Sequence, residues 1–297
     1  MKTPSLLEKK KRPFDTLCYT MIYISTFLVL ALIAIILLYC IIKGKDHVSW
    51  TFITEAPSII KNTKGIGGNI LNTLYLIFLS LLIAIPFSLG CAVYLNEYAK
   101  PGKFVNAVNF ATETLAGIPS IIFGIFGMEF FGTLLGFHFS IVTGALTLSI
   151  LIFPLITRNT QEALKTVPKS YREGALGLGV TKWVMIRTIL LPSALPGILT
   201  GLILAIGRII GESAALLFTA GSGYQLPDAM TQYFSKFMES GGSLSVQLYL
   251  SMANADFNTA YGLALVLIVI SLGLNFLAHR GVALFDPNKK LKIKEKK

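Results

Sequence analysis

The segment Ser170-Tyr171-Arg172-Glu173-Gly174-Ala175-Leu176-Gly177-Leu178-Gly179, followed by Ile189-Leu190-Leu191-Pro192, carries the strongest signal for the fold. It lies in a polar and basic region, residues 157 to 190, between two long apolar regions. Ser170 and Glu173 have the spacing of a capping box, in which the two side chains bind free amide groups at the start of a helix. The region therefore predicts a short polar helix that begins near Ser170 and joins two apolar helices.

The composition is that of a membrane protein. The chain has 297 residues, of which 54% are hydrophobic and 14% are charged, and its mean hydropathy is +0.68. Soluble domains carry considerably more charge. Six segments are long enough to cross about 30 Å of hydrocarbon as helices. They are Cys18 to Ile42, Leu71 to Leu95, Leu115 to Phe131, Phe139 to Ile156, Ala194 to Ala220 and Tyr261 to Ala278. The sequence thus predicts an all-α membrane protein with six transmembrane helices.

Lysine and arginine are distributed unequally between the connections, which predicts the orientation in the membrane. Most of these residues lie in the two tails and in residues 157 to 190, so we expect all three regions to be cytoplasmic. The basic run from Lys9 to Arg12 precedes the first span, but this span is too long for a signal peptide and lacks a small-residue cleavage site. We expect it to remain as a helix. The net charge of +11 follows the asymmetry and favours contact with anionic lipids over nucleic acid.

Four regions follow from this pattern. Residues 1–17 form a cytoplasmic basic tail, 18–68 the first transmembrane helix with an extracytoplasmic linker, 69–280 the main transmembrane domain, and 281–297 a second cytoplasmic basic tail. The three cysteines and three histidines show no metal-ligand spacing, and no G-x-x-x-x-G-K-[ST] loop is present. The sequence therefore predicts no metal site, no nucleotide site and no catalytic residue in this chain.

Arg208 is the one basic residue inside a predicted span, near the middle of residues 194 to 220. An arginine at that depth costs at least about 2.5–3.5 kcal/mol, so it suggests a function and a partner. In a continuous helix, Glu212 lies one turn later and Thr219 returns to nearly the same face. The guanidinium offers donors matched to a tetrahedral oxyanion, and the carboxylate keeps the empty site near neutrality. We predict an anion pathway at Arg208, Glu212 and Thr219; an ion pair that only orients the helix is the alternative.

Three other patterns concern the backbone. Gly197, Gly201, Gly207 and Gly211 have spacings that predict the close approach of another helix. Gly117-Ile118-Pro119-Ser120 interrupts the third predicted span and indicates either a packing kink or a broken helix that lines a pathway. In the connection of residues 221 to 257, Asp228 precedes apolar residues at helical spacing, which predicts an amphipathic helix capped by Asp228. These apolar residues are Met230, Tyr233, Phe234, Phe237 and Met238.

Residues 157 to 190 resemble the coupling signature of type-1 ABC importer permeases. The resemblance implies that Glu173, Gly174 and Ala175 form a cytoplasmic coupling helix, that Gly179 turns the chain, and that Ile189, Leu191 and Pro192 lead into the next span. Gly174 stands where the family has alanine. A glycine inside a helix costs about 1 kcal/mol relative to alanine, so this turn is expected to be softer. The resemblance implies a type-1 ABC importer permease fold with a cytoplasmic coupling helix.

Three further segments resemble the A-type permease subunit of phosphate-specific ABC importers. They are Asn96-Glu97-Tyr98-Ala99, the run from Glu113 to Ser120, and the run from Gly207 to Ala220. The likeness extends from about Asn69 to Arg280 and implies that Arg208 and Glu212 belong to a phosphate pathway at the permease interface. It also implies a heterodimer with a homologous C-type permease, two cytoplasmic ATPase subunits that bind ATP and Mg, and an extracytoplasmic phosphate-binding protein, all at the cell membrane.

Other functions compete with phosphate import. The nearest is a type-1 permease for another oxyanion, such as molybdate, sulfate or phosphonate. A membrane scaffold or sensor linked to phosphate signalling is a different class. A membrane enzyme would need a Ser-His-Asp or metal-ligand group at one depth, and the sequence has none. A secondary transporter would need no ATPase, whereas residues 157 to 190 indicate one.

Overall fold

The computed structural model describes residues 13–57, 64–226 and 232–285, and every regular element in these ranges is helical. Five helical segments are long and apolar enough to cross a membrane: Phe14–His47, Gly67–Tyr98, Ile141–Thr166, Lys182–Gly211 and Phe257–Gly281. A sixth candidate is a pair of helices, Lys103–Gly117 and Ser120–Leu134, bent by 99°. The predicted all-α membrane class is confirmed, and the predicted six spans correspond to these five segments and the bent pair.

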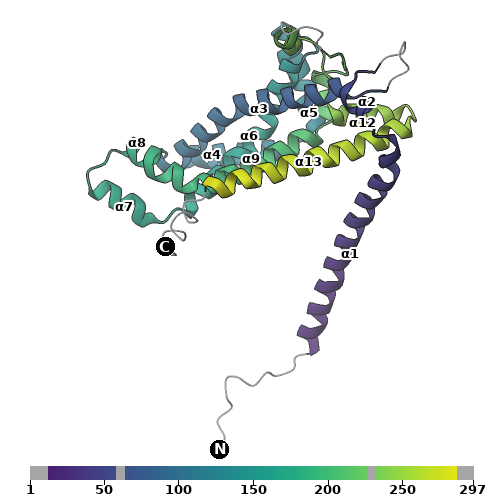
Figure 1. Ribbon diagram of the computed structural model, residues 1–297. Coiled ribbons are helices and arrows are strands. Elements are labelled where there is room, and N and C mark those ends of the chain that lie inside the picture. The colour runs from purple at the N-terminus through teal and green to yellow at the C-terminus, as the bar shows by residue number, and fades with distance from the viewer. Residues whose placement is uncertain (1–12, 58–63, 227–231, 286–297) are drawn as a thin grey trace, which may run out of the picture.

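The elements follow one another along the chain as Figure 1 labels them. The long helices are α1 (Pro13–Gly44), α3 (Gly67–Val93), α6 (Ile141–Thr166), α9 (Leu191–Gly211) and α13 (Phe257–Phe285). The shorter helices are α2 (Trp50–Thr54), α4 (Lys103–Gly117), α5 (Ser120–Gly127), α7 (Lys169–Gly177), α8 (Lys182–Met185), α10 (Ala214–Thr219), α11 (Gln232–Ser235) and α12 (Leu244–Ala253). Short π-helical turns continue α3 (Tyr94–Tyr98), α5 (Met128–Leu134) and α8 (Ile186–Leu190), and 3-10 turns lie at Lys45–His47 and Lys236–Met238.

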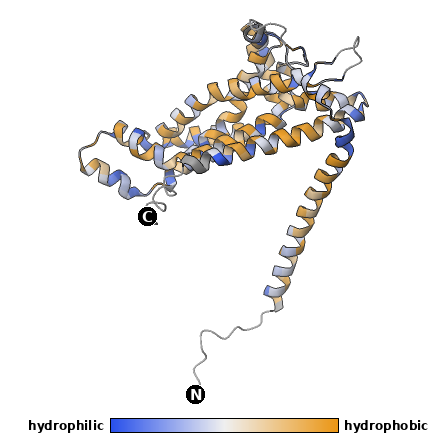
Figure 2. Ribbon diagram, viewed as in Figure 1, coloured by the Kyte–Doolittle hydropathy of each residue, from blue (hydrophilic) through white to orange (hydrophobic). Residues whose placement is uncertain are grey.

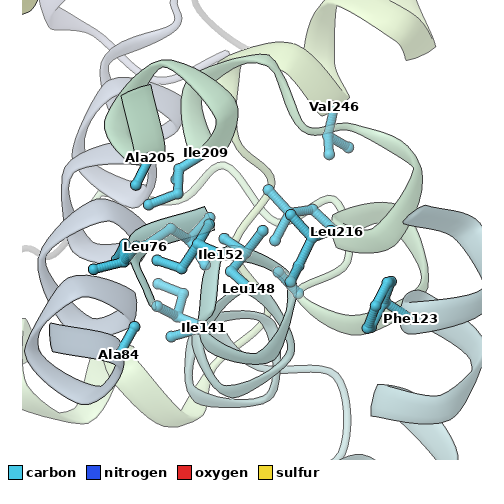
Figure 3. Close-up of a cluster of buried hydrophobic side chains, with 14 residues drawn as sticks. Leu76, Ala84, Phe123, Ile141, Leu148, Ile152, Ala205, Ile209, Leu216 and Val246 are labelled. Atoms are coloured by element: carbon cyan, nitrogen blue, oxygen red, sulfur yellow. The ribbon is translucent and has the colours of Figure 1, made fainter. Parts of the chain in front are cut away.

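Helix α6 is the centre of the bundle and packs against both α3 and α9. Ile141, Leu148 and Ile152 recur on one face of α6 and are fully buried. Figure 3 shows them in one cluster with side chains of the neighbouring helices, among them Leu76 of α3 and Ile209 of α9. In a membrane, packing rather than water exclusion holds helices together. This dense centre therefore fixes the positions of the helices that carry the candidate site.

Glycines set the distance between α9 and α6. A Cβ atom on Gly197 would lie 2.6 Å from the Cβ of Ala163, and one on Gly201 would lie 2.6 Å from the Cβ of Asn159. The predicted close helix approach is confirmed at these two positions. Added Cβ atoms on Gly207 and Gly211 would meet no atom within 4 Å. The second pair therefore leaves open space beside Arg208 on the described chain.

Helix α1 stands away from the other helices (Figure 1), and no residue of its apolar window is buried. It contacts α13 only near its end, where the Tyr39 and Tyr261 hydroxyls are 3.1 Å apart and Gly44 lies against the main chain of Tyr261. Figure 2 shows hydrophobic residues along α1 and the other long helices, and a group of hydrophilic residues at α7. This distribution fits long helices in contact with lipid and a polar projection outside it.

The connection of residues 221 to 257 contains several short helical elements. The described part of the predicted amphipathic helix forms the short α11 and a 3-10 turn, and the apolar α12 follows them. Asp228 and Met230 lie outside the described residues. The amides of Asn69 and Asn72 on α3 donate to the carbonyls of Gly242 and Gly223, both at 2.9 Å. Since this connection lacks the regular hydrogen bonds of one long helix, side chains of α3 satisfy part of its backbone and hold it over the start of α3.

Candidate functional site

The third predicted span, Leu115 to Phe131, is broken. Helix α4 ends at Gly117, Ile118 is extended, and α5 begins after Pro119 with a change of direction of 99°. Proline has no amide hydrogen, so the first turn of a helix tolerates it and the interior does not. The helix is thus broken rather than merely kinked, and its place along a pathway stays a prediction. The break brings α5 against α10, where Gly124 faces the main chain of Ala215.

Gly124 is a testable element of this packing. A Cβ atom there would lie 2.9 Å from the Ala215 Cα, a distance that requires the backbone to move. We expect Gly124→Ala to destabilise the protein by about 1–3 kcal/mol, the usual effect of overpacking, seen as a lower melting temperature of the purified protein. Gly117→Ala is the matched control, because a Cβ atom on Gly117 meets nothing within 4 Å. Equal melting temperatures for both variants would contradict the contact.

The fifth predicted span, Ala194 to Ala220, is also discontinuous. Helix α9 ends at Gly211, Glu212 is extended with φ −79° and ψ 121°, and α10 begins at Ala214. The prediction that Arg208, Glu212 and Thr219 share one face of a single helix is therefore wrong. Arg208 lies in the last turn of α9, Glu212 lies at the break, and Thr219 lies on a separate helix.

Arg208 lines a cavity of about 370 Å³ between α4, α5, α6 and α9. A second arginine, Arg158 of α6, lines the same cavity. The other polar lining residues are Asn109, Thr112, Glu113, Asn159 and Gln161, and the apolar ones are Leu115, Ala116, Phe123, Leu151, Pro154 and Leu155. Two cations and several amide and hydroxyl groups around a partly apolar space form an environment suited to a small anion.

The two arginines differ in their partners. Nη1 of Arg158 is 2.9 Å from Oε1 of Glu113 on α4, and its Nε is 3.0 Å from Oε1 of Glu162 on α6. Arg208 is exposed and forms no ion pair within the described residues. The cavity thus contains one arginine that two carboxylates bind and one arginine that forms no ion pair with a described side chain. A negatively charged solute would find its strongest attraction at Arg208.

Glu212 and Thr219 are not among the described residues that line this cavity. Glu212 is 8% exposed; its Oε1 accepts a hydrogen bond from the Ala215 amide at 3.1 Å, and its carbonyl accepts one from the Ser245 hydroxyl at 2.6 Å. Thr219 is buried and donates to the Ala215 carbonyl. Glu212 therefore satisfies a free amide at the start of α10, as an N-terminal cap does.

Arg158 and Glu113 are the functional candidates that the sequence did not single out. The fourth span was predicted to end at Ile156, and Arg158 was assigned to a cytoplasmic connection. Helix α6 instead continues to Thr166, so Arg158 lies on a helix that faces the cavity. The four-residue spacing of Arg158 and Glu162 was a usable signal, because it favours an ion pair on a helix.

The predicted coupling segment forms the polar projection at α7. Glu173 and Gly174 are exposed on α7, whereas Ala175 is 5% exposed and packs with Leu164 and Met185. Gly179 has φ +76°, a left-handed conformation that favours glycine, so the predicted turn is confirmed. Pro192 lies in the first turn of α9, where Ile189 and Leu191 lead into the helix as predicted.

The predicted capping box is wrong. Helix α7 begins at Lys169 after Pro168, and no side chain caps its first turn. Ser170 lies inside the helix because Pro168, two residues earlier, already fixes the backbone at the helix start. Glu173 is therefore exposed at the surface and forms no ion pair with any residue that the structure describes.

Comparisons with known proteins agree with this architecture. The family model of binding-protein-dependent transport system inner membrane components matches residues 84–291. A probable ABC transporter permease protein of Bacillus subtilis, YqgI, is 40% identical over 70% of each chain. The phosphate transport system permease protein PstA of Mycobacterium leprae is 31% identical over 86% of this chain and 84% of its own.

A solved structure shows the same fold. It is a bacterial alginate ABC transporter, one chain of which is 18% identical and superimposes with a TM-score of 0.68 over 93% of this chain and 96% of its own. At this identity the likeness concerns the fold, which is that of a type-1 ABC importer permease. The sequence relatives are permease subunits, and ATP hydrolysis is the task of another subunit. The chain belongs to the binding-protein-dependent transport system inner membrane components, the multi-pass membrane permeases of ABC transporters.

Proposed function

We propose that this chain is the A-type permease subunit of an ATP-driven importer of inorganic phosphate, and that the cavity lined by Arg208 and Arg158 belongs to the phosphate pathway. Relatives named as phosphate transport permeases cover most of the chain, which supports the substrate. The cavity carries the proposal because it combines Arg208, which forms no ion pair with a described side chain, with hydrogen-bonding groups. A type-1 permease for molybdate, sulfate or phosphonate is the alternative within the same architecture.

The charges of the cavity suit transient binding. The planar guanidinium of Arg208 can donate two parallel hydrogen bonds to a phosphate oxygen pair. Glu113 at 2.9 Å and Glu162 at 3.0 Å both bind Arg158 and offset its positive charge. Two free arginines would bind a divalent anion too tightly for rapid release, whereas one free and one paired arginine bind it less strongly. This arrangement favours passage of the anion over its retention.

Glu212 remains a predicted selectivity residue. Its Oε1 is used by the Ala215 amide, and its Oε2 accepts no hydrogen bond from the described residues. A carboxylate oxygen can accept a hydrogen bond from the protonated oxygen that phosphate has near neutral pH and that sulfate lacks. We expect sulfate to inhibit phosphate uptake more strongly in Glu212→Gln than in the native protein. Equal inhibition, measured with radioactive phosphate in vesicles, would leave Glu212 with its capping role alone.

The proposal includes an assembly of several subunits. A homologous C-type permease would complete the pathway, with the open space at Gly207 and Gly211 beside Arg208 as part of the interface. Two cytoplasmic ATPases, which bind ATP and Mg, would dock at α7, and an extracytoplasmic phosphate-binding protein would deliver the cargo. This arrangement requires α7 and both termini to be cytoplasmic, in agreement with the excess of lysine and arginine there.

Reconstitution tests the proposal directly. The chain is purified with its associated subunits and placed in liposomes, and phosphate uptake is measured with and without ATP. We expect ATP-dependent uptake of phosphate that excess sulfate, molybdate and phosphonate inhibit weakly. Preferential uptake of another oxyanion would reassign the cargo. Equal uptake without ATP would remove the ABC importer mechanism, and no uptake with intact signalling to a phosphate-responsive partner would favour a sensor.

A further inference from the structure

Arg172 of α7 makes the densest group of polar contacts in the coupling segment. Its Nη2 is 2.8 Å from Oε1 of Glu97, and its Nε also donates to the same carboxylate. Its Nη1 and Nη2 donate at 2.9 Å to the carbonyls of Val167 and Leu164. One guanidinium thus joins three elements: α7, the last turn of α6, and the π-helical end of α3 that contains Glu97.

The burial of this ion pair makes it rigid. The side chains of Arg172 and Glu97 are 20% and 5% exposed. Water competes weakly for charges in such a place, and the loss of either partner leaves an unpaired charge that is costly to bury. The carbonyls at the end of α6 carry a partial negative charge, which also favours a guanidinium there. The Asn96 amide donates at 2.6 Å to Oε1 of Glu97, the same oxygen that Nη2 of Arg172 binds, and adds a second hold on the carboxylate.

The rest of α7 is held less firmly. Ala175 packs into an apolar cluster, but Glu173, Gly174, Gly177 and Leu178 are exposed. The backbone on either side of α7 turns at Pro168 and Gly179. A force applied to the exposed face of α7 would therefore rotate this short helix unless a strong contact resisted the movement. The Arg172–Glu97 pair is that contact.

We propose that Arg172 and Glu97 are positioning residues that make α7 and the end of α3 move together, so that movement of the ATPase reaches the membrane helices. The inference rests on the proposed function for its cargo and for the ATPase at α7, whereas its geometry comes from the contacts of Arg172 and Glu97. Arg172 touches neither the cavity of Arg208 nor the exposed carboxylate of Glu173. Its role is to convert displacement of α7 into displacement of α3.

The test compares phosphate uptake with ATP hydrolysis in the same liposomes that contain the complete complex. Glu97→Gln, Arg172→Gln and the double variant are measured beside Arg172→Lys. We expect each glutamine variant to keep ATP hydrolysis within about twofold of the native rate and to lose about tenfold in phosphate moved per ATP. The double variant should lose no more phosphate moved per ATP than the worse single variant, because each single substitution already removes the same Arg172–Glu97 contact. Arg172→Lys should move an amount of phosphate per ATP between those of the native complex and the glutamine variants. Lysine keeps the charge but lacks the planar guanidinium that reaches Glu97 and both carbonyls.

The matched control removes an ion pair elsewhere. Lys64 and Asp256 are 2.8 Å apart but their side chains are 64% and 35% exposed, so Lys64→Gln should leave the uptake-to-hydrolysis ratio unchanged. An unchanged ratio in Glu97→Gln, or additive losses in the double variant, would overturn the proposal. If Arg172→Gln fails to assemble with the ATPase, Glu97→Gln decides, because it keeps the size of the side chain and all contacts of Arg172 with α6.

A distance measurement separates this proposal from the proposed cargo. Spin labels on the exposed Ser170 of α7 and the exposed Phe87 of α3, in a background without the three native cysteines, report whether the helices move as one unit. We expect one narrow distance distribution with and without ATP in the native complex, and a broader one in Glu97→Gln. Identical distributions would overturn the proposed link. A native complex that moves no phosphate would instead refute the proposed function, whatever the distances show.

Discussion

Arg208→Ala is expected to abolish ATP-dependent phosphate uptake while the subunits still assemble. The guanidinium is exposed in the cavity and pairs with no carboxylate of the described residues, so its removal leaves no buried charge without a partner. Each charge-assisted hydrogen bond to the anion contributes about 1.5–3 kcal/mol. Loss of two such bonds corresponds to a decrease in uptake of about a hundredfold or more. Initial uptake rates in liposomes measure the effect.

Two variants control for general effects of losing this side chain. Arg208→Lys keeps the charge but loses the paired donors of the planar guanidinium, so we expect uptake between that of the native complex and that of Arg208→Ala. Arg280→Ala removes an exposed arginine from α13, where its guanidinium lies 4.9 Å from the ring centre of Phe276, and should transport normally. Co-purification and the melting temperature establish that each complex is intact. Native uptake by an intact Arg208→Ala complex would show that the cavity is no part of the pathway.

The sequence was sufficient for the class of fold and for the polar helix α7. Long apolar segments clearly indicate membrane-spanning helices, because lipid offers no hydrogen bonds to the backbone and a helix satisfies its own. Pro119 marked the break between α4 and α5 because it removes an amide donor. The break at Glu212 had no comparable signal, since residues 194 to 220 are mostly apolar, no proline lies near Glu212, and a single glycine such as Gly211 is compatible with a helix. The contact that accompanies it, between Gly124 and Ala215, joins residues far apart in the chain.

The sequence identified only part of the candidate site. Arg208 was found because a charge in an apolar span is rare. Arg158 was missed because the polar residues after Ile156 resemble a solvated connection, although they continue α6 with one face toward the cavity. The contact between Arg158 and Glu113 joins residues 45 positions apart in the chain. Local spacing contains no information about such a pair, so only the packing of α4 against α6 reveals it.

Glu173→Lys is expected to separate ATP hydrolysis from transport. Glu173 is exposed on α7 and forms no ion pair within the described chain, so charge reversal should leave the permease itself folded. At an interface with an ATPase, the new lysine would meet the cationic group that the glutamate binds, and the loss of such a pair costs about 2–5 kcal/mol. We expect at least about tenfold less co-purified ATPase, or hydrolysis that no longer drives uptake.

Asp46→Lys is the matched control, because it makes the same change of charge at an exposed position beyond the end of α1, far along the chain from α7. It should keep both the co-purified ATPase and the uptake per ATP of the native complex.

The Glu173 result also distinguishes two roles within α7. If Glu173→Lys loses ATPase binding while Glu97→Gln retains it, that result would assign ATPase docking to the exposed face of α7 and the transmission of movement to its buried face. Native binding and native uptake with Glu173→Lys would exclude this carboxylate from the interface, and the ATPase would then have to contact the projection through other residues.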